Sequence, residues 1–520
     1  MASRAITLDG VRVRPSDIAD LASHGEIAVR ADPSGLDRAA AAHRAAQEIA
    51  RHRPVYGRTT GVGANRTEDV AAADGDTHGL RLLRSHAGGI GPYVPADQVR
   101  AMLAVRANQI LAGGAGLQPA FAEALVQALG SGHLPRVHEV GAIGTGDLTA
   151  LAETGLTLIG ERPWTGGRGA PPAPVTLEPG DALAFISSSA LTIGQAALAW
   201  ARIAASLRAA NVVAALSLHA VDGGSEPYDA EVHAGRPHPG NAEVAAEMRR
   251  LLGGPRRGVR VQDPFGYRCF PQVHGPAVEA VARVERVLEI EVNAAAENPL
   301  IRAAGGGSVH HHGGFHQATL ALALDHLRVA LLQSAQLSAA RLATLVEPAF
   351  TGLRPFLADG APAASGVMIL EYSANSALAD LRGVAQPAAL GHAVLSRGVE
   401  EHAGFAAQSA RQTLRAAVSY RLVLACELVA AVRAVRQRAH PAEAAKPGRA
   451  TPGSVASGSA ASGSVASGSV RSGRPVPDPA TPVGAAFAAV ASQLDPRTED
   501  RPLSADVERA VALLDALATV

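Results

Sequence analysis

The sequence predicts a mostly α-helical protein: an elongated bundle of long helices with a smaller, mixed subdomain at the N-terminus. Hydrophobic residues make up 47% of the 520 residues but aromatic residues only 3%, so the core must consist mainly of Ala, Leu and Val. Ala and Leu are strong helix formers and allow helices to pack closely. Long Ala/Leu-rich stretches with apolar residues at helical spacing supply the bundle, namely Leu191–Ala220, Val273–Val292, Gln317–Val346 and Gln408–Val435.

Composition divides the chain into four parts. Residues 1–190 are rich in Gly, Pro and polar turns, and only short helices such as Val99–Leu111 are expected there. Residues 191–440 carry the long-helix bundle. Residues 441–481 form a Ser/Gly/Ala-rich insertion that we expect to be flexible, because it cannot bury enough apolar area to become ordered. Residues 482–520 resume a helical pattern and are expected to pack on the main body.

Charge and cysteine content narrow the class of protein. Lys plus Arg and Asp plus Glu both number 47, so the basic excess of a nucleic-acid-binding protein is missing and a small-molecule partner is expected. Two cysteines, Cys269 and Cys426, cannot form a disulfide framework. The N-terminus lacks the layout of a secretion signal, and we find no uninterrupted apolar run of about 18 residues. The expected location is the cytoplasm.

Five polar clusters interrupt the apolar pattern and are the candidate functional segments. They span residues 55–63, 84–91, 140–148, 262–272 and 398–402. In the first, Tyr56 opens a glycine-rich loop and could act as a base if neighbouring cations lower its pKa. A structural tyrosine packed under the loop is the alternative. In the second, His86 could be a ligand contact or a satisfied structural histidine.

The other three clusters are equally open when taken one at a time. Gly141–Asp147 precede a helical stretch and could cradle an anion, but the Lys and the spacing of a phosphate loop are missing. Arg268 could bind a carboxylate bidentately or form an intersubunit salt bridge. Glu400 and Glu401 could simply complement the dipole of the helix that follows. No single cluster names a reaction.

The stretch Val309–His316 contains four histidines and invites a metal assignment. Adjacent histidines in a glycine-rich loop lack the i,i+4 spacing of a zinc site, and no carboxylate completes the set. We therefore expect no metal.

Taken in order, the clusters resemble the family of histidine, phenylalanine and tyrosine ammonia-lyases and aminomutases, over most of the chain. The matching blocks are Tyr56–Gly63 (the family's YGxxTGFG), Ser85-His86-Ala87 (its selectivity segment), Arg106-Ala107-Asn108 (LRAN), Gln262–Val273 (QDPYSLRCxPQV), Glu291–Leu300 (ExNxxxDNPL), Gly314-Phe315-His316 (GNFHG) and Glu400-Glu401-His402 (QEDH). So many blocks in one order identify the chain as a member of this family.

The resemblance implies a fold, an assembly and a set of roles. The fold is a mostly helical bundle with a smaller N-terminal catalytic subdomain, and the assembly is a homotetramer whose active sites draw on more than one subunit. Tyr56 is the implied base, and Glu400 would pair with an imidazole or an amine. The implied substrate-binding residues are Ser85, His86, Ser187, Arg268, Phe315 and Met368. Ser85-His86 and Glu400 favour a histidine-like substrate.

The resemblance also implies a cofactor, and here the sequence departs from the family. Family members form an electrophilic methylidene-imidazolone from an internal Ala-Ser-Gly, by backbone cyclisation and loss of two waters. At that place this chain has Gly144-Thr145-Gly146, one residue is deleted, and Thr145 replaces the serine. Ser187 stands where the family has the Asn that contacts the ring, and Phe265 replaces the tyrosine of QDPY. From these departures we expect that no cofactor matures.

The predicted function is a carbon–nitrogen lyase that eliminates an amine from histidine or a histidine-like α-amino acid to give an acrylate. Without the electrophile, such an enzyme would need a substrate that carries its own good leaving group, such as the trimethylammonium of a histidine betaine. Two alternatives remain: a catalytically inactive, ligand-binding family member, and a conventional ammonia-lyase or aminomutase in which Thr145 does mature.

Overall fold

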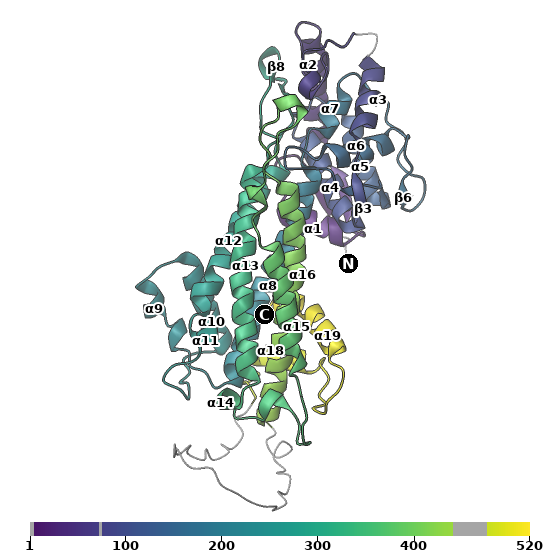
Figure 1. The fold of residues 1–520 in the computed structure, drawn as a ribbon. Coiled ribbons are helices and arrows are strands. Elements are labelled where there is room, and N and C mark those ends of the chain that lie inside the picture. The colour runs from purple at the N-terminus through teal and green to yellow at the C-terminus, as the bar shows by residue number, and fades with distance from the viewer. Residues whose placement is uncertain (1–4, 72–74, 440–475) are drawn as a thin grey trace, which may run out of the picture. The chain divides into compact units, whose positions relative to one another are not determined.

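The computed structural model describes residues 5–71, 75–439 and 476–520, and the described part is mostly helical (Figure 1). The predicted insertion, 441–481, therefore lies outside the described residues except at its end. The chain forms two compact units, each assembled from separate segments. Unit 1 comprises Met1–Ile203, Ala280–Arg328 and Val384–Arg415, and unit 2 comprises Ala204–Glu279, Val329–Gly383 and Ala416–Val520.

Four long helices confirm the helical pattern read from the sequence. They are α8 (Ala190–Ala220), α12 (Phe270–Val292), α13 (Ala318–Leu345) and α16 (Ala406–Ala439). α12 begins three residues earlier than predicted, because Pro271 occupies its first turn, where a missing N–H costs no helical hydrogen bond. The apolar window within Asp181–Ala220 is long and hydrophobic enough for a membrane span, but all of it is buried inside the structure, as in a core helix.

Shorter helices and small sheets make up most of the remaining structure of unit 1. Its helices before α8 are α1 (Pro15–Ser23), α2 (Pro33–Ala50), α3 (Gly75–His86), α4 (Ala96–Leu111), α5 (Pro119–Ser131), α6 (Leu148–Leu158) and α7 (Asp181–Ile186). Its two-stranded sheets pair β1 (Ala5–Leu8) with β2 (Ala28–Ala31), β3 (Ile90–Tyr93) with β5 (His138–Val140), β4 (His133–Leu134) with β6 (Thr165–Gly166), and β7 (Leu300–Arg302) with β8 (Ser308–His310). Only the first pair is parallel.

Unit 2 holds the remaining α-helices of the described residues. They are α9 (Ala230–Ala234), α10 (Pro239–Leu252), α11 (Phe265–Arg268), α14 (Pro348–Thr351), α15 (Ile369–Val384, whose last residue falls in unit 1), α18 (Pro482–Ala491) and α19 (Ser504–Leu517).

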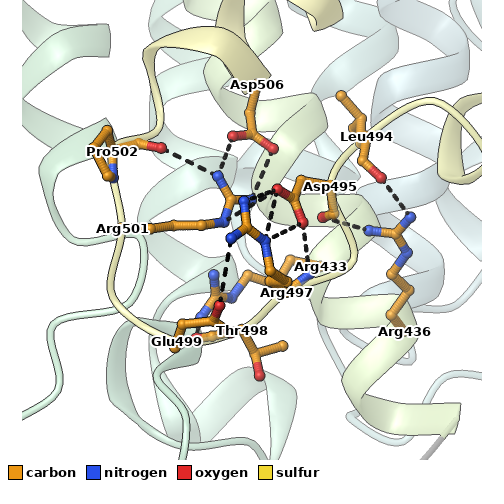
Figure 2. Close-up of polar contacts among 10 residues, drawn as sticks. All are labelled: Arg433, Arg436, Leu494, Asp495, Arg497, Thr498, Glu499, Arg501, Pro502 and Asp506. Atoms are coloured by element: carbon orange, nitrogen blue, oxygen red, sulfur yellow. Dashed lines mark hydrogen bonds and ion pairs between the residues drawn. The ribbon is translucent and has the colours of Figure 1, made fainter.

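Arginines anchor the segment between α18 and α19 to α16 (Figure 2). Arg436 of α16 donates to the carbonyl oxygens of Asp495 and Leu494, both at 3.0 Å. Arg501 forms a bidentate pair with Asp506, at 2.6 and 3.0 Å. Because an arginine presents several donors in a fixed plane, it can satisfy a run of loop carbonyls that no helix supplies with partners. The final two helices are thereby attached to α16.

Candidate active site

A cavity of about 1070 Å³ lies in unit 1, and residues from widely separated parts of the chain line it. Its polar and charged lining residues are Tyr56, Thr60, Asn65, Arg66, His86, Thr145, Ser187, Asn298, His311, His312, His316, Ser396, Glu400, Glu401 and His402. Six of the predicted site residues are among its lining: Tyr56, His86, Thr145, Ser187, Phe315 and Glu400. The structure thus brings together residues up to 344 positions apart, from Tyr56 to Glu400.

Tyr56 lies in the loop between α2 and α3, which we call the tyrosine loop (residues 54–66). Gly57 has φ +70°, and a Cβ there would lie 1.9 Å from Leu183, so only glycine fits. The buried Arg58 donates to the carbonyls of Pro179 (2.7 Å) and Gly116 (2.9 Å) and pins the loop. These contacts fix the start of the loop beside the cavity.

The electrostatics of Tyr56 correct one expectation. Burial raises the pKa of the Tyr56 phenol and nearby Glu400 adds to the rise, whereas the Gly63 amide and Arg66 oppose it. The Gly63 N–H donates to Tyr56 Oη at 2.7 Å. Within one chain, therefore, the pKa of Tyr56 is raised overall, because desolvation outweighs the lowering effect of Arg66 on which the sequence interpretation depended.

The loop that carries Thr145 turns sharply and is held by main-chain hydrogen bonds. Gly144 and Gly146 have φ of +92° and +109°, and a Cβ on Gly144 would lie 2.6 Å from the Ala406 nitrogen. Three main-chain hydrogen bonds hold the loop: Phe405 N–H to Ile143 O (2.7 Å), Gln317 N–H to Gly144 O (3.1 Å) and Asp147 N–H to Ser188 O (2.7 Å). Two glycines at positive φ on either side of Thr145 make the chain turn sharply at the cavity wall.

Asp147 ends this loop and is fully buried at the start of α6. Its carboxylate accepts hydrogen bonds from the Thr192 N–H (2.7 Å) and the Thr192 hydroxyl (2.8 Å). Burial nevertheless raises the pKa of Asp147 to about 6, since these donors only partly offset the desolvation of the carboxylate. Asp147 therefore ties the Thr145 loop to α8.

The segment before α16 forms another wall and carries residues that the sequence interpretation did not assign. We call residues 395–402 the glutamate loop. His402 Nδ1 lies 3.0 Å from His316 Nε2, and burial lowers the pKa of His316, with His402 adding to the effect. His402 and Glu401 stood inside a recognised block, so their spacing alone could have suggested them. Ser396 carried no sequence signal.

The histidine stretch takes part in the cavity wall. His311 Nε2 accepts the Tyr56 N–H at 3.3 Å. His312 Nε2 donates to the Glu297 carbonyl (2.9 Å), and its Nδ1 accepts the Gly314 N–H (2.8 Å), so the main chain engages both ring nitrogens. Across the described ranges, no group of three or more His, Cys, Asp or Glu side chains is arranged to hold a metal.

Buried contacts orient the remaining lining residues. The Ser187 hydroxyl accepts the Asn298 N–H at 3.0 Å. Arg106, fully buried, donates to Glu297 at 2.6 Å, so the two sequence blocks that contain them meet behind the cavity. His86 Nδ1 lies 2.9 Å from the Leu82 carbonyl, which can only accept. His86 therefore carries its proton on Nδ1, and its Nε2 is an acceptor.

The other predicted site residues do not line this cavity. Ser85 is exposed and its hydroxyl donates to the Leu82 carbonyl, while Gly144 and Gly146 flank the lining residue Thr145. Arg268 and Met368 belong to unit 2 and are not among the residues that line the cavity in unit 1.

Arg268 lines a second, polar cavity of about 700 Å³ within unit 2. Its guanidinium carbon lies 4.3 Å from the centre of the Phe265 ring, and its Nε is buried without a hydrogen-bond partner among the residues described. Phe265 is 63% exposed and Val261 97% exposed. A charged side chain with a spare donor thus lines a polar cavity and lies against the exposed ring of Phe265.

Comparison with known proteins shows which family and which solved structure this chain resembles. The family model described as aromatic amino acid lyase matches residues 13–456. The chain is 36% identical to histidine ammonia-lyase from Geobacillus kaustophilus (strain HTA426) over 409 residues, which cover 75% of this chain and 81% of the relative. It is 34% identical to histidine ammonia-lyase from Sorangium cellulosum (strain So ce56) over 540 aligned positions, covering 98% and 97%. Tyrosine aminomutase from Streptomyces globisporus superposes with a TM-score of 0.85 at 25% identity, covering 99% and 97%.

The fold and the similar proteins together indicate a carbon–nitrogen lyase. The chain belongs to the aromatic amino acid lyase family. The expected family, fold class and enzyme class are thereby confirmed.

Family membership also overturns one expectation. Ammonia-lyases and aminomutases of this family form a methylidene-imidazolone autocatalytically, so the expectation that this chain carries no such cofactor is wrong. The cofactor-free elimination that rested on it falls as well. The Thr145 loop fits the group in two respects: positive φ at both flanking glycines turns the chain sharply at Thr145, and main-chain hydrogen bonds hold the loop on both sides.

Proposed function

We propose that the protein is an ammonia-lyase that acts on histidine or a histidine-like α-amino acid and releases the corresponding acrylate. One observation carries this proposal: the cavity in unit 1 gathers Tyr56, His86 and Glu400 around the Thr145 loop. An imidazole substrate needs an acceptor and a carboxylate for its ring, and a base for its β-proton. The three side chains offer these groups.

The ring of the substrate would be held by His86 and Glu400. Because His86 Nδ1–H donates to Leu82, its Nε2 is available to accept the N–H of an imidazole. The Glu400 carboxylate can accept a charge-assisted hydrogen bond from the other ring nitrogen or from the amine. Phe315 adds an apolar wall, and the Ser187 hydroxyl lies beside the Thr145 loop. This set favours imidazole over a purely apolar ring.

Tyr56 would take the β-proton of the substrate on its Oη. The Gly63 N–H that already donates to Oη stabilises the phenolate, but burial works against it. A further cation is therefore needed near the phenol, and unit 2 carries one in Arg268. We propose that Arg268 of a second copy enters the cavity, binds the substrate carboxylate bidentately and lowers the pKa of Tyr56.

An assembly that shares sites in this way is the homotetramer that the family resemblance implies. The exposed Phe265 and Val261 beside Arg268 support it, because a second copy would cover them. The two cysteines of the chain are free, and we propose a cytoplasmic location.

The cofactor would be formed by Gly144, Thr145 and Gly146, and it supplies an electrophilic alkene that makes the amine of the substrate a better leaving group. The chain's own residues hold its precursor: Ser188 accepts the Asp147 N–H, and Asp147 is bound to Thr192. Because Thr145 replaces a serine, the alkene would bear an additional methyl group.

The test is a direct assay of the purified full-length protein. L-histidine is supplied, conjugated acrylate is followed by ultraviolet absorbance, and ammonia is measured in the same sample. We expect both products in equal amounts from histidine, and far less from phenylalanine or tyrosine. Calorimetric binding of histidine without release of ammonia would overturn the proposal and indicate a ligand-binding protein.

A further inference from the structure

The glutamate loop holds its shape at a conformational cost. The Leu395 N–H donates to the Glu400 carbonyl at 2.9 Å and closes the loop. Inside it, Ser396, Arg397 and Gly398 have φ of +52°, +56° and +84°. Left-handed backbone is rare for residues other than glycine, and it persists only where surrounding contacts enforce it. Two such residues in succession therefore call for a contact that holds them.

That contact comes from the tyrosine loop. Ser396 Oγ accepts the Ala64 N–H at 2.9 Å. The same oxygen presses on Gly63: a Cβ at Gly63 would lie 2.6 Å from Ser396 Oγ and 3.4 Å from Glu400 Oε1. Gly63 itself has φ +56°, so glycine is required for space and for conformation. The two loops are interlocked at this point, on the wall of the cavity.

Two consecutive amides of the tyrosine loop thus donate hydrogen bonds to two different side-chain oxygens. The Gly63 N–H donates to Tyr56 Oη at 2.7 Å, and the next amide, that of Ala64, donates to Ser396 Oγ. Because the two amides share one short turn, fastening the second fixes the direction of the first. The glutamate loop therefore determines whether the phenol keeps its hydrogen-bond donor.

We propose that Ser396 is a positioning residue for Tyr56: its hydroxyl fastens the tyrosine loop to the glutamate loop and aims the Gly63 amide at the phenolic oxygen. This inference rests on the proposed function, in which Tyr56 is the base. It adds a residue of the cavity wall whose proposed effect on Tyr56 is transmitted through the Gly63–Ala64 turn.

The chemical consequence is a change in the acidity of Tyr56. A donor on Oη stabilises the phenolate relative to the phenol, whereas burial disfavours the charge. The charged groups that act on Tyr56 within the chain are Glu400 from the glutamate loop and Arg66 from its own loop, and His311 from the segment after β8 accepts its N–H. Arg268 of a second copy is the further cation proposed above, and His312, His316, Glu401 and His402 line the same cavity. None of these groups is removed by a change at Ser396, so loss of the aimed amide can be measured by itself.

The test compares two variants of neighbouring left-handed residues. S396G keeps a backbone suited to positive φ and removes the hydroxyl, so the loop can still fold. R397G relieves the same kind of strain one residue away and keeps the hydroxyl, which makes it the matched control. For both variants and the wild type, hydrogen exchange is measured at the tyrosine loop, and Tyr56 is titrated by ultraviolet difference absorbance against the corresponding Y56F protein.

We expect S396G to speed exchange of the Ala64 amide about tenfold and to raise the pKa of Tyr56, with R397G like the wild type. The alkaline rise of kcat should move to higher pH in S396G while KM for histidine stays constant. Unchanged exchange and titration in S396G would overturn the inference. If the wild type releases no ammonia but Tyr56 still shifts in S396G, the proposed lyase function fails and the positioning role stands.

Discussion

Glu427 of α16 accepts two parallel hydrogen bonds from Arg341 of α13, from Nε at 2.6 Å and from Nη2 at 2.8 Å. Ser217 of α8 and Ser338 also donate to this carboxylate, at 2.7 and 2.6 Å. Three long helices thus meet at one buried charge in unit 2. A buried carboxylate is tolerated only when its partners satisfy it so fully.

Removal of the Glu427 charge should lower the stability of the folded protein. E427Q leaves the buried Arg341 guanidinium without its counter-charge, and we expect the free energy of unfolding to fall by about 3–5 kcal/mol. The control is E247Q, whose partner Arg250 lies three residues away on the surface of α10, where about 1 kcal/mol or less is expected. Denaturant unfolding of both variants measures the difference. Equal losses would show that the ion pair in the core is no stronger than the surface pair.

Tyr56 is the proposed base, so Y56F should lower kcat by about 10²- to 10⁴-fold, the usual contribution of general-base catalysis. The control is Y93F, since Tyr93 is 52% exposed on β3 and does not line the cavity. Steady-state assay with histidine gives both values. Turnover in Y56F close to that of Y93F would remove Tyr56 from its proposed role.

Thr145 should lose its hydroxyl when the loop cyclises. Intact-protein mass spectrometry should therefore find the wild type lighter than its sequence by two waters. T145S, which restores the serine of the family, should show the same deficit. T145V has no hydroxyl to lose and so cannot lose both waters. A wild-type protein of full sequence mass would show that the loop does not mature.

Asp147 should make stability depend on pH in a defined window. Its folded pKa, about 6, lies above the ordinary value of 3.8, so the folded state binds the proton more tightly than the unfolded state. The resulting stabilisation, about 3 kcal/mol, is complete below pH 4 and is lost as pH rises through about 6. D147N lacks this dependence.

The measurement for Asp147 is the unfolding free energy of the wild type minus that of D147N, from about pH 4 to about pH 7. Other carboxyls titrate in both proteins and cancel in the difference. We expect the difference to fall as pH rises. A constant difference would mean that the carboxyl is ionised throughout the window in the folded protein.

Shared sites predict complementation between inactive variants. Y56F and R268Q should each be nearly inactive when expressed alone. When they are co-expressed, about a quarter of the cavities in randomly mixed oligomers should combine an intact Tyr56 with an intact Arg268 from different copies. Activity should reappear in proportion. If none returns, Tyr56 and Arg268 do not serve one cavity across copies.

The long helices and part of the candidate site could be predicted from the sequence. Helical periodicity predicted α8, α12, α13 and α16 to within a few residues, because these helices repeat an apolar pattern over many turns. Motif order predicted that Tyr56, His86 and Glu400 would belong to one site. His311 and Ser396 escaped, because each acts through a neighbour that lies about 250 to 330 residues away, and no local spacing encodes such a contact.

By itself, the sequence determined the helical fold class, the family and the residue types from which an imidazole-binding site is proposed. Only the tertiary structure decided the surroundings of these residues and which segments of the chain they contact. It raised the pKa of Tyr56 through burial, held the Thr145 loop by main-chain hydrogen bonds to Phe405, Gln317 and Ser188, and located Arg268 in the other unit. The physical reason is the same in each case: desolvation, clamping and the choice of neighbour arise from atoms that are distant along the chain and meet only after folding.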